Sequence, residues 1–255
     1  MLAQQRHNAI MAQVHARGTV QVQDLAESLD VSTMTIRRDL AELDELGVLT
    51  RVHGGPPLVT SAPEPQFAEK MAINADAKSA IARAALNLVH SSQSIGIAGG
   101  STCTKIAQEI TAQPELTDIT VVTNSLQVLN IFHADLKPGI KTLLTGGERT
   151  PSDAFVGPIA DAALSTLSTD ILFMGAHGIG EKGLFTPNLH EGHTNQVFMK
   201  SAREVVAVFD ATKWSVTGLM RFGEWRDVDT VITSNTITDE QHRVLTDNVN
   251  KVVVA

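Results

Sequence analysis

Hydroxyl and guanidinium side chains gather in one short segment near the amino terminus, within the string DVSTMTIRRDL. They are Ser32, Thr33, Thr35, Arg37 and Arg38. Hydroxyl groups and arginines donate hydrogen bonds to phosphate oxygens, and arginine also pairs with the edge of guanine. These side chains would recognise a nucleic acid if the segment is a helix that presents them on one face.

The flanking residues predict such a helix. Ser32 is a good N-cap residue for it. Apolar residues follow at intervals of four, three and three, the spacing of a buried helical stripe: Ile36, Leu40, Leu43 and Leu46. With this stripe inward, the hydroxyls and arginines face outward near the amino end of the helix. The acids Glu42, Asp44 and Glu45 come after that end.

The neighbouring segments predict a winged helix-turn-helix. Helices are expected at 3–16 and 21–29, and the third helix ends at Gly47. A strand and turn, VLTRVHGG, follow and form a wing that carries Arg51 and His53. This element lays its third helix in the major groove of double-stranded DNA. The alternative is a packing or dimerisation module whose arginines form a solvated face.

The net charge shows that the chain is not a generic basic binder. It carries 20 Lys and Arg against 28 Asp and Glu, a formal charge of −8. Residues 1–57 hold five arginines and seven acids, a net charge of −2. Non-specific DNA binding depends on many contacts between cations and phosphates. The count therefore disfavours a non-specific DNA scaffold protein and favours a few cations placed on the reading face.

A second group of polar residues lies in the segment IGIAGGSTCTKIAQEI, which reads as strand, glycine loop and helix. Backbone N–H groups at the start of a helix favour an anion, and glycines let it approach. The candidate ligand contacts are Gly99, Gly100, Ser101, Thr102 and Thr104. The spacing is neither that of a Walker A loop nor that of a dinucleotide fingerprint. A phosphorylated small molecule and a tight turn that needs glycine only for packing both remain open.

Further polar residues follow the ends of other predicted strands. They are Asn124, Ser125, Gly146, Gly147, Gly175, His177, Asp210 and Lys213. In an open α/β sheet the carboxyl ends of the strands line the ligand crevice. We therefore expect these residues to converge near the glycine loop and form an effector pocket.

The alternation of helices and short apolar strands after residue 75 predicts the fold class. An α/β domain with a mostly parallel sheet covered on both faces, a Rossmann-like three-layer arrangement, is expected. The predicted domains are a winged helix-turn-helix at 1–57, a linker at 58–75 and an α/β effector-binding domain at 76–255. Helices are predicted at 76–90, 102–112, 124–133, 158–167, 191–203 and 238–247. Strands are predicted at 94–98, 118–123, 140–145, 170–175, 204–209, 228–233 and 250–254.

Other chemistry receives little support. The string HEGH places His190 and His193 three residues apart around Glu191, without HExxH spacing or an evident third ligand, so no metal site is expected. Cys103, the single cysteine, has no clear histidine partner, so it is not a predicted nucleophile. No cofactor is expected. No apolar run of membrane-spanning length and no signal-peptide core is present, so we expect no membrane partner and a cytoplasmic location.

The string DVSTMTIRRDLAELDELGVLTRVHGG resembles the signature of the DeoR family of bacterial transcriptional regulators. The pieces GGSTCT, TNS, LTGG, GAHGI and DATK match the family as well. The resemblance implies a repressor of a carbohydrate operon, with operator DNA and a phosphorylated sugar as partners. It also implies a homo-oligomer, dimer or tetramer, and a sensing domain similar to ribose-5-phosphate isomerase and coenzyme A transferases.

Two positions depart from the family pattern. Family members commonly carry an acid before the glycine loop, where this chain has Ala98, and a cation after Glu191, where it has Asn195 and Gln196. Both changes point to an effector that differs from the usual one. An enzyme, either a phosphosugar isomerase or a coenzyme-A-transferase-like protein with a DNA-binding appendage, stays open as the alternative. An isomerase needs a carboxylate base, for which Glu148 and Asp153 remain.

Overall fold

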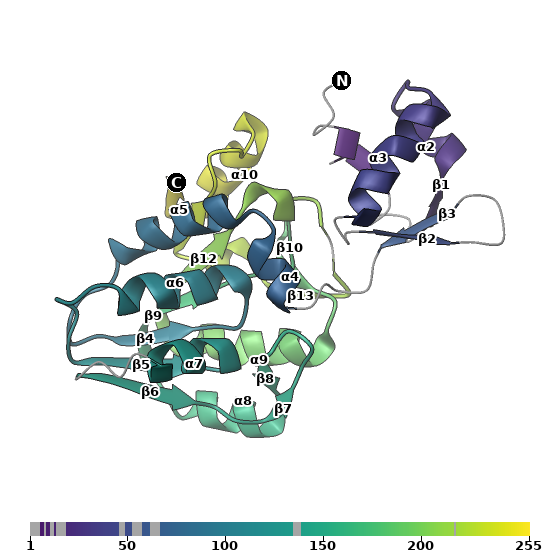
Figure 1. Cartoon of the computed structure of the whole chain (residues 1–255). Coiled ribbons are helices and arrows are strands. Elements are labelled where there is room, and N and C mark those ends of the chain that lie inside the picture. Colours follow the sequence, from purple (N-terminus) through teal and green to yellow (C-terminus); the bar gives the residue numbers. More distant parts are fainter. Residues whose placement is uncertain are drawn as a thin grey trace. The chain divides into compact units, whose positions relative to one another are not determined.

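The structure is a computed structural model that forms two compact units, Met1–Pro65 and Gln66–Ala255 (Figure 1). It describes residues 6–7, 9–10, 13, 19–45, 49–52, 58–61, 67–134, 139–216 and 218–255. The first unit contains one cluster of buried apolar side chains, and the second contains two. Across the described ranges, we find no helix whose length and hydropathy would let it cross a membrane.

The first unit packs helices α2 (Val22–Ser28) and α3 (Thr33–Glu45) against each other and onto the residues before them. Its core holds Ile10 and Leu25 together with Ile36, Leu40 and Leu43, so the described part of the predicted apolar stripe is buried. A three-stranded antiparallel sheet has the order β1 (Thr19–Gln21), β3 (Leu58–Ser61), β2 (Leu49–Val52). Leu46, Gly47 and most of the predicted helix 3–16 lie outside the described residues.

The predicted linker 58–75 needs correction, because two regular elements lie in it. Strand β3 takes the central place in the first unit's sheet and pairs with both β1 and β2. Helix α4 (Phe67–Ala72) is the first helix of the second unit. These elements span only four and six residues, too short to display a period against a background of proline and alanine.

The second unit is built on a parallel seven-stranded sheet, as the sequence predicts. The strand order is β15-β14-β12-β9-β4-β5-β6. The strands are β4 (Ser94–Ile97), β5 (Ile119–Thr123), β6 (Ile140–Leu144), β9 (Thr169–Met174), β12 (Ala202–Phe209), β14 (Thr230–Thr233) and β15 (Lys251–Val254). The chain runs from β4 outward to β6, then returns to β9 and continues the opposite way. The topological switch point, where open α/β sheets bind ligands, therefore lies between β4 and β9.

Helices cover both faces of this sheet and complete the three layers (Figure 1). One apolar cluster contains residues of α5 (Ala75–Leu86), α6 (Ser101–Thr111) and α7 (Leu126–Ala134). The other contains residues of α8 (Pro158–Ser165), α9 (Leu189–Lys200) and α10 (Asp239–Asn248). The α/β fold class predicted from the alternation is therefore confirmed.

Several short elements in the connections were not predicted. A hairpin joins β7 (Glu148–Arg149) to β8 (Phe155–Val156), and a small antiparallel sheet joins β10 (Gly178–Gly180), β11 (Gly183–Thr186) and β13 (Met220–Gly223). Two 3-10 turns lie at Ala211–Lys213 and Trp225–Asp227. The β7–β8 hairpin follows β6, β10 follows β9, and the turn at Ala211–Lys213 follows β12, so these elements lie near the predicted pocket residues.

Candidate DNA-reading surface and effector site

The amino end of α3 has the predicted cap. Ser32 Oγ accepts a hydrogen bond from the backbone N–H of Thr35 at 3.1 Å and lies 2.9 Å from Thr35 Oγ1. Beyond the cap, Thr33, Arg37 and Arg38 are exposed, and the Arg38 side chain is 72% exposed. Arg38 Nε is 3.9 Å from Glu42 Oε1, a distance at which an exposed pair contributes little. The exposed face of α3 therefore carries two arginines and a threonine, while the opposite face is buried.

The buried side of α3 is held by an ion pair that the sequence did not reveal. Arg6 Nε donates to Asp39 Oδ2 at 2.6 Å, and its Nη2 donates to Oδ1 at 2.8 Å, with Asp39 only 1% exposed. Hydrogen bonds from Arg6 hold the pKa of Asp39 below its usual value. The pair fixes residue 6 to the middle of α3 and so anchors the helix behind its reading face.

His7 brings a third titratable group to this pair. His7 Nε2 lies 3.3 Å from Asp39 Oδ1 and 3.5 Å from Glu42 Oε2. Among the described residues this is the single cluster with ligand atoms close enough for a metal ion. Both oxygens of Asp39 already accept from Arg6, so the arrangement is that of an ion-pair network.

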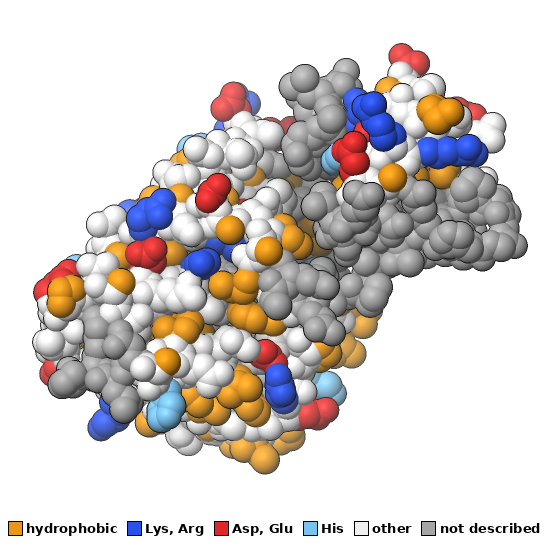
Figure 2. Space-filling view, viewed as in Figure 1, with side chains coloured by type: hydrophobic (Ala, Val, Ile, Leu, Met, Phe, Trp, Pro, Cys, Tyr) orange, Lys and Arg blue, Asp and Glu red, His pale blue; other side chains and the backbone are white. Residues whose placement is uncertain are grey.

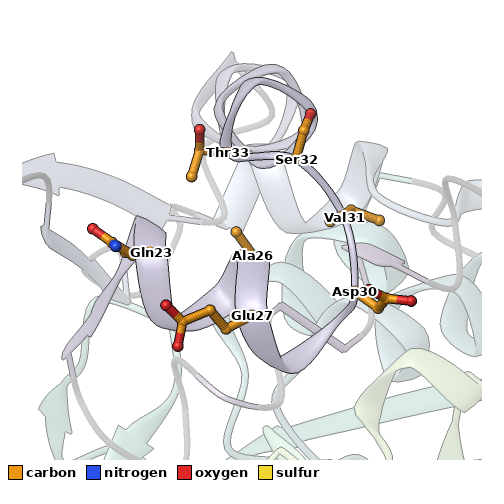
Figure 3. A pocket seen from close by; sticks show the side chains of 7 residues that line it. All are labelled: Gln23, Ala26, Glu27, Asp30, Val31, Ser32 and Thr33. Carbon is orange, nitrogen blue, oxygen red and sulfur yellow. The ribbon is translucent and has the colours of Figure 1, made fainter.

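A shallow groove of about 510 Å³ lies at the corner where α2 turns into α3 (Figure 3). Gln23 and Glu27 line it from α2, Asp30 and Val31 from the turn, and Thr33 from the start of α3. Glu27 and Asp30 repel phosphate groups, so phosphate contacts are favoured on the arginine side of α3. Figure 2 likewise shows the cations of this unit as small groups beside acidic side chains.

Two further residues bear on the reading surface. Arg51 lies on β2, opposite Val59 of β3, but its side chain and the whole of His53 are outside the described part. Met34 was missed by the sequence reasoning although it lies on α3 between two predicted contacts. Its side chain is 73% exposed. Its position outside the apolar stripe was the signal that could have identified it. An exposed apolar side chain on a recognition helix can contact the methyl group of thymine.

In the second unit, the glycine loop follows β4 at the switch point. Gly100 is the N-cap of α6 with φ 133°, and a Cβ added there would have no heavy atom within 4 Å. No side chain of a described residue caps this helix. The first amides of a helix have no acceptor within the helix, so those of α6 are available to a ligand.

Neighbouring loops hold the glycine loop in place. Gly99 N–H donates to Asn124 Oδ1 at 3.0 Å, and Asn124 Nδ2 donates to the carbonyl of Phe155 at 3.2 Å. A Cβ on Gly175 would lie 3.9 Å from the carbonyl oxygen of Gly99, so the loops after β4 and β9 adjoin. The structure thus brings together Gly99, Gly100, Asn124 and Gly175.

Other predicted site residues have structural partners. Thr104 Oγ1 donates to the carbonyl of Gly100, and Ser125 Oγ accepts from the N–H of Val128 at 3.4 Å. A Cβ on Gly147 would meet the Val156 carbonyl at 2.5 Å, so the hairpin requires glycine there. Thr102 is buried. Eight residues of the predicted effector set are partly exposed: Gly99, Gly100, Ser101, Gly146, Gly147, Gly175, His177 and Lys213.

Asp210 follows β12 and is 2% exposed. Its Oδ1 accepts hydrogen bonds from Asn74 Nδ2, Thr212 N and Thr212 Oγ1. Its Oδ2 is buried and accepts none from a described residue. Asp210 therefore retains one carboxylate oxygen for a donor such as a ligand hydroxyl.

Lys78 on α5 is a buried charge that the sequence reasoning missed. It is 2% exposed, and burial lowers the pKa of its ammonium to about 8, with Asp210 opposing that shift. Lys213, Lys70 and Lys105 add like-charge repulsion that lowers it further. The inward spacing of Lys78 with Ile81 and Ala82 was the available signal. Of these groups Lys78 and Asp210 are buried, whereas Lys70, Lys105 and Lys213 are partly exposed.

The remaining candidate groups are Cys103, the residues of the HEGH string and Ala98. Cys103 is buried, and burial raises the pKa of its thiol to about 12, which keeps it an unreactive thiol. His190 and His193 are exposed, and Glu191 accepts from Thr150 Oγ1 at 2.6 Å. Ala98 is buried in an apolar cluster at the end of β4.

Comparisons with known proteins agree with this two-part organisation. Residues 6–62 match the DeoR-like helix-turn-helix domain, and residues 73–235 match the DeoR C terminal sensor domain. A winged helix-turn-helix joined to an α/β sensor unit defines a transcriptional regulator, and this chain belongs to the DeoR family.

Similar curated proteins are named regulators. A lactose phosphotransferase system repressor of Staphylococcus epidermidis is 31% identical over 242 residues, 94% of this chain and 95% of that protein. A putative aga operon transcriptional repressor of Escherichia coli O157:H7 is 31% identical over 234 residues, 89% of this chain and 85% of that protein. The regulator GolR of Listeria innocua is 31% identical over 248 residues, 95% of both chains.

Solved structures are more distant. Ribose 5-phosphate isomerase A of Methanocaldococcus jannaschii is 22% identical with a TM-score of 0.41, over 55% of each chain. The eIF-2B translation initiation factor of Pyrococcus horikoshii is 11% identical with a TM-score of 0.46, over 88% of this chain and 86% of that one. These scores are too low to bear on function.

Proposed function

We propose that this DeoR-family regulator is a cytoplasmic repressor of a carbohydrate-metabolism operon, released from its operator by a phosphorylated sugar or a related metabolite. Relatives named after lactose and aga operons support carbohydrate control. Operators mirror the two-fold symmetry of the proteins that bind them, which supports a homo-oligomer, a dimer or a tetramer.

The split of α3 into a buried and an exposed face carries the DNA-binding part of this proposal. The cap at Ser32 fixes where the helix begins, and the buried stripe fixes which face it turns away. Thr33, Arg37 and Arg38 then occupy the outer face at the amino end, the part of a recognition helix that contacts bases. A net charge of −2 over residues 1–57 means that one copy makes few phosphate contacts, which favours paired half-sites.

The glycine loop at the switch point supports the effector part. Gly100 leaves open space at the uncapped start of α6, and the lysines near Lys78 supply positive charge. The unpartnered oxygen of Asp210 suits a sugar hydroxyl. An anionic group and hydroxyl donors occur together in a phosphorylated sugar. Ligand contacts are proposed for Ser101 and Lys213 in addition to the loop.

Of the two candidate carboxylate bases, Glu148 and Asp153, the second is better suited to a structural role than to turnover. Burial favours protonation of Asp153, but hydrogen bonds from Gln127 and Arg149 outweigh it and hold the pKa below the ordinary value. A general base for isomerisation works best with a pKa raised toward neutrality. Asp153 is therefore a structural acid that secures the β7–β8 hairpin.

The test is a thermal-shift screen of the full chain with pentose and hexose phosphates, each paired with its unphosphorylated sugar. We expect stabilisation by phosphorylated members only, and loss of binding to promoter DNA in their presence. The matched variants are Ser101→Glu, which places a carboxylate at the α6 amino end, and Ser165→Glu at the far end of α8. Ser101→Glu should bind DNA normally but ignore the effector. Release of DNA from that variant, or turnover of a sugar phosphate by the wild type, would contradict the proposal.

A further inference from the structure

Helix α8 turns an apolar side to solvent. All of its residues are described, and the exposed ones are uncharged: Pro158, Ile159, Ala162 and Ser165. The Ile159 side chain is 68% exposed, whereas Ala160 and Leu164, on the other side of the helix, are buried. In Figure 2, apolar side chains gather along the lower edge of the second unit, over α8. The outer face of this helix therefore has the composition of a buried one.

The acid of α8 is used within the unit. Asp161 Oδ1 accepts a hydrogen bond from Thr194 Oγ1 at 2.6 Å, and its Oδ2 lies 3.5 Å from His193 Nε2. Both partners are on α9, so Asp161 turns toward that helix. Helix α10 packs into the same apolar cluster and exposes four charged residues: Asp239, Glu240, Arg243 and Asp247. A charged outer face is the normal pattern for a surface helix, and α8 departs from it.

The apolar face continues onto the edge strand of the sheet. Strand β6 ends the strand order, and its Leu143 is 39% exposed. Leu143 lies opposite Val122, which belongs to the same apolar cluster as Leu164 of α8, so Leu143 is on the α8 side of the sheet. A Cβ on Gly146, in the loop after β6, would lie 3.8 Å from Ile159 Cγ2. We call the following residues the α8 patch: Leu143, Pro158, Ile159 and Ala162.

The electrostatics of the α8 patch suit a second copy of the same patch. In a two-fold contact, side chains near the axis meet their own copies, so a charge there would face a like charge. The four members of the patch are uncharged, and Lys141, on the same side of β6, stands at its margin. A core depleted of charge with a polar rim is the composition of homodimer interfaces. The patch therefore complements itself.

The area of α8 indicates how far such a contact extends. A stable dimer buries roughly 800 Å² on each copy. A helix of eight residues is about 12 Å long and about 10 Å wide, so α8 alone supplies only a minor part of that area. The contact must also cover neighbouring elements, and the exposed Leu143 makes β6 the first of them.

We propose that two copies of this chain associate through the α8 patch, with α8 packed against α8 of the second copy across a two-fold axis. The inference rests on the homo-oligomer of the proposed function and adds the surface that forms it. Two winged helix-turn-helix units then belong to one dimer, which is what paired half-sites require. Ile159 is the central apolar contact of this interface.

Sedimentation velocity of the full chain over a range of concentrations tests the interface. Ile159→Glu and Ile159→Lys should each raise the dimer dissociation constant roughly a hundredfold or more, because each places like charges beside the axis. An equimolar mixture of the two variants should associate again as a heterodimer, since opposite charges then meet. Leu219→Glu, at a side chain that is 76% exposed just before β13, is the matched control and should associate like the wild type.

A second measurement needs no substitution and covers the case in which an Ile159 variant fails to fold. Amide hydrogen exchange in residues 159–165 of the wild type should slow as the protein concentration rises through the dimer dissociation constant. Exchange in α10, outside the patch, should not respond to concentration. Equal responses of α8 and α10 would overturn the assignment of the interface to α8.

The sedimentation outcomes separate the interface from the proposed function. An oligomeric wild type that both Ile159 variants leave unchanged overturns the α8 patch and leaves the proposed homo-oligomer intact. Ile159 variants that dissociate but do not associate when mixed overturn the two-fold contact. Dissociation of Leu219→Glu alone places the interface elsewhere and overturns the inference as well. A wild type that is monomeric at every concentration, free and on operator DNA, overturns the homo-oligomer and this inference together.

Discussion

Asn74 and Asp210 are hydrogen bonded, Nδ2 to Oδ1 at 3.1 Å, although 136 positions separate them. Asn74 occupies the turn between α4 and α5 with φ 53°, a left-handed conformation that asparagine tolerates better than most residues. Asp210 directly follows β12, the neighbour of β9 in the sheet. One side chain thus satisfies a strained turn and ties the start of the second unit to its ligand edge.

This double role predicts different costs for two substitutions. Asn74→Gly should lose only the hydrogen bonds, whereas Asn74→Ala should also strain the left-handed backbone. We expect the free energy of unfolding of the second unit to be lower in Asn74→Ala than in Asn74→Gly by about 1 kcal/mol, measured by thermal or urea unfolding. Trp214 and Trp225 report that unfolding by fluorescence. An alanine variant as stable as the glycine variant would show that backbone strain does not select Asn74.

Arginine at the amino end of α3 should account for a large part of operator affinity. Replacing Arg37 or Arg38 with Ala should weaken operator binding by about 1–3 kcal/mol if the arginine contacts a base. If it contacts a phosphate, the slope of log affinity against log salt concentration should fall by about 1. Fluorescence anisotropy at several salt concentrations distinguishes these cases. Arg243→Ala, an exposed arginine on α10, is the control. Unchanged affinity in both α3 variants would remove α3 as the recognition helix.

The Arg6–Asp39 pair should make the first unit sensitive to acid. Because the folded-state pKa of Asp39 is lowered, its contribution is present above the ordinary value of about 4 and is lost as the pH falls below it. Asp39→Asn removes the charge that pairs with Arg6, so it should lower the stability of the first unit at neutral pH. Hydrogen exchange of the α3 amides measures the stability of the first unit. Tryptophan fluorescence does not report on that unit, because both tryptophans lie in the second unit. The difference in α3 stability between Asp39→Asn and the wild type should disappear toward pH 3. Asp24→Asn, on the exposed surface of α2, should be as stable as the wild type at every pH.

The sequence predicted the elements whose apolar period extends over several turns or a full strand. Ile36, Leu40 and Leu43 are buried as expected, and the main strands of the second unit lie within a few residues of their predicted bounds. Helix α4 and strand β3 were missed because they are short. Their stability comes from tertiary partners, as the capping of α4 by Lys78 shows.

For the candidate effector site, the sequence predicted which loops are involved but not the role of each side chain. Glycine and hydroxyl residues signalled the loop after β4, but Thr104 and Ser125 turned out to bond the backbone. Lys78 escaped notice because a lysine among helical residues is normally a solvated one. Only the packing of α5 against α6, and the position of Asp210, show that this lysine is buried.

The burial of Lys78 should make the second unit more stable in alkali. Its pKa of about 8 lies below the ordinary lysine value, so between the two the unfolded chain binds more protons than the folded one. Stability contributed by this group therefore rises with pH across that window, by a total on the order of 3 kcal/mol. Below pH 8 the cost of burying the charge is fully present. Urea unfolding at pH 7.5 and 10 should show this rise in the wild type relative to Lys78→Met, and an equal response in both would mean that the lysine is not buried.

Met34 should contribute specificity that arginine cannot supply. Its side chain is 73% exposed on the reading face of α3, and an apolar group there contacts thymine through the 5-methyl group. Replacing the contacted thymine with uracil removes that methyl alone, at an expected cost of roughly 1 kcal/mol for the wild type. Met34→Ala should bind the thymine site more weakly and should show no further loss with uracil. Uracil placed outside the half-site is the control. If each thymine in a selected half-site tolerates uracil in the wild type, Met34 does not read a methyl group, and its exposure has another cause.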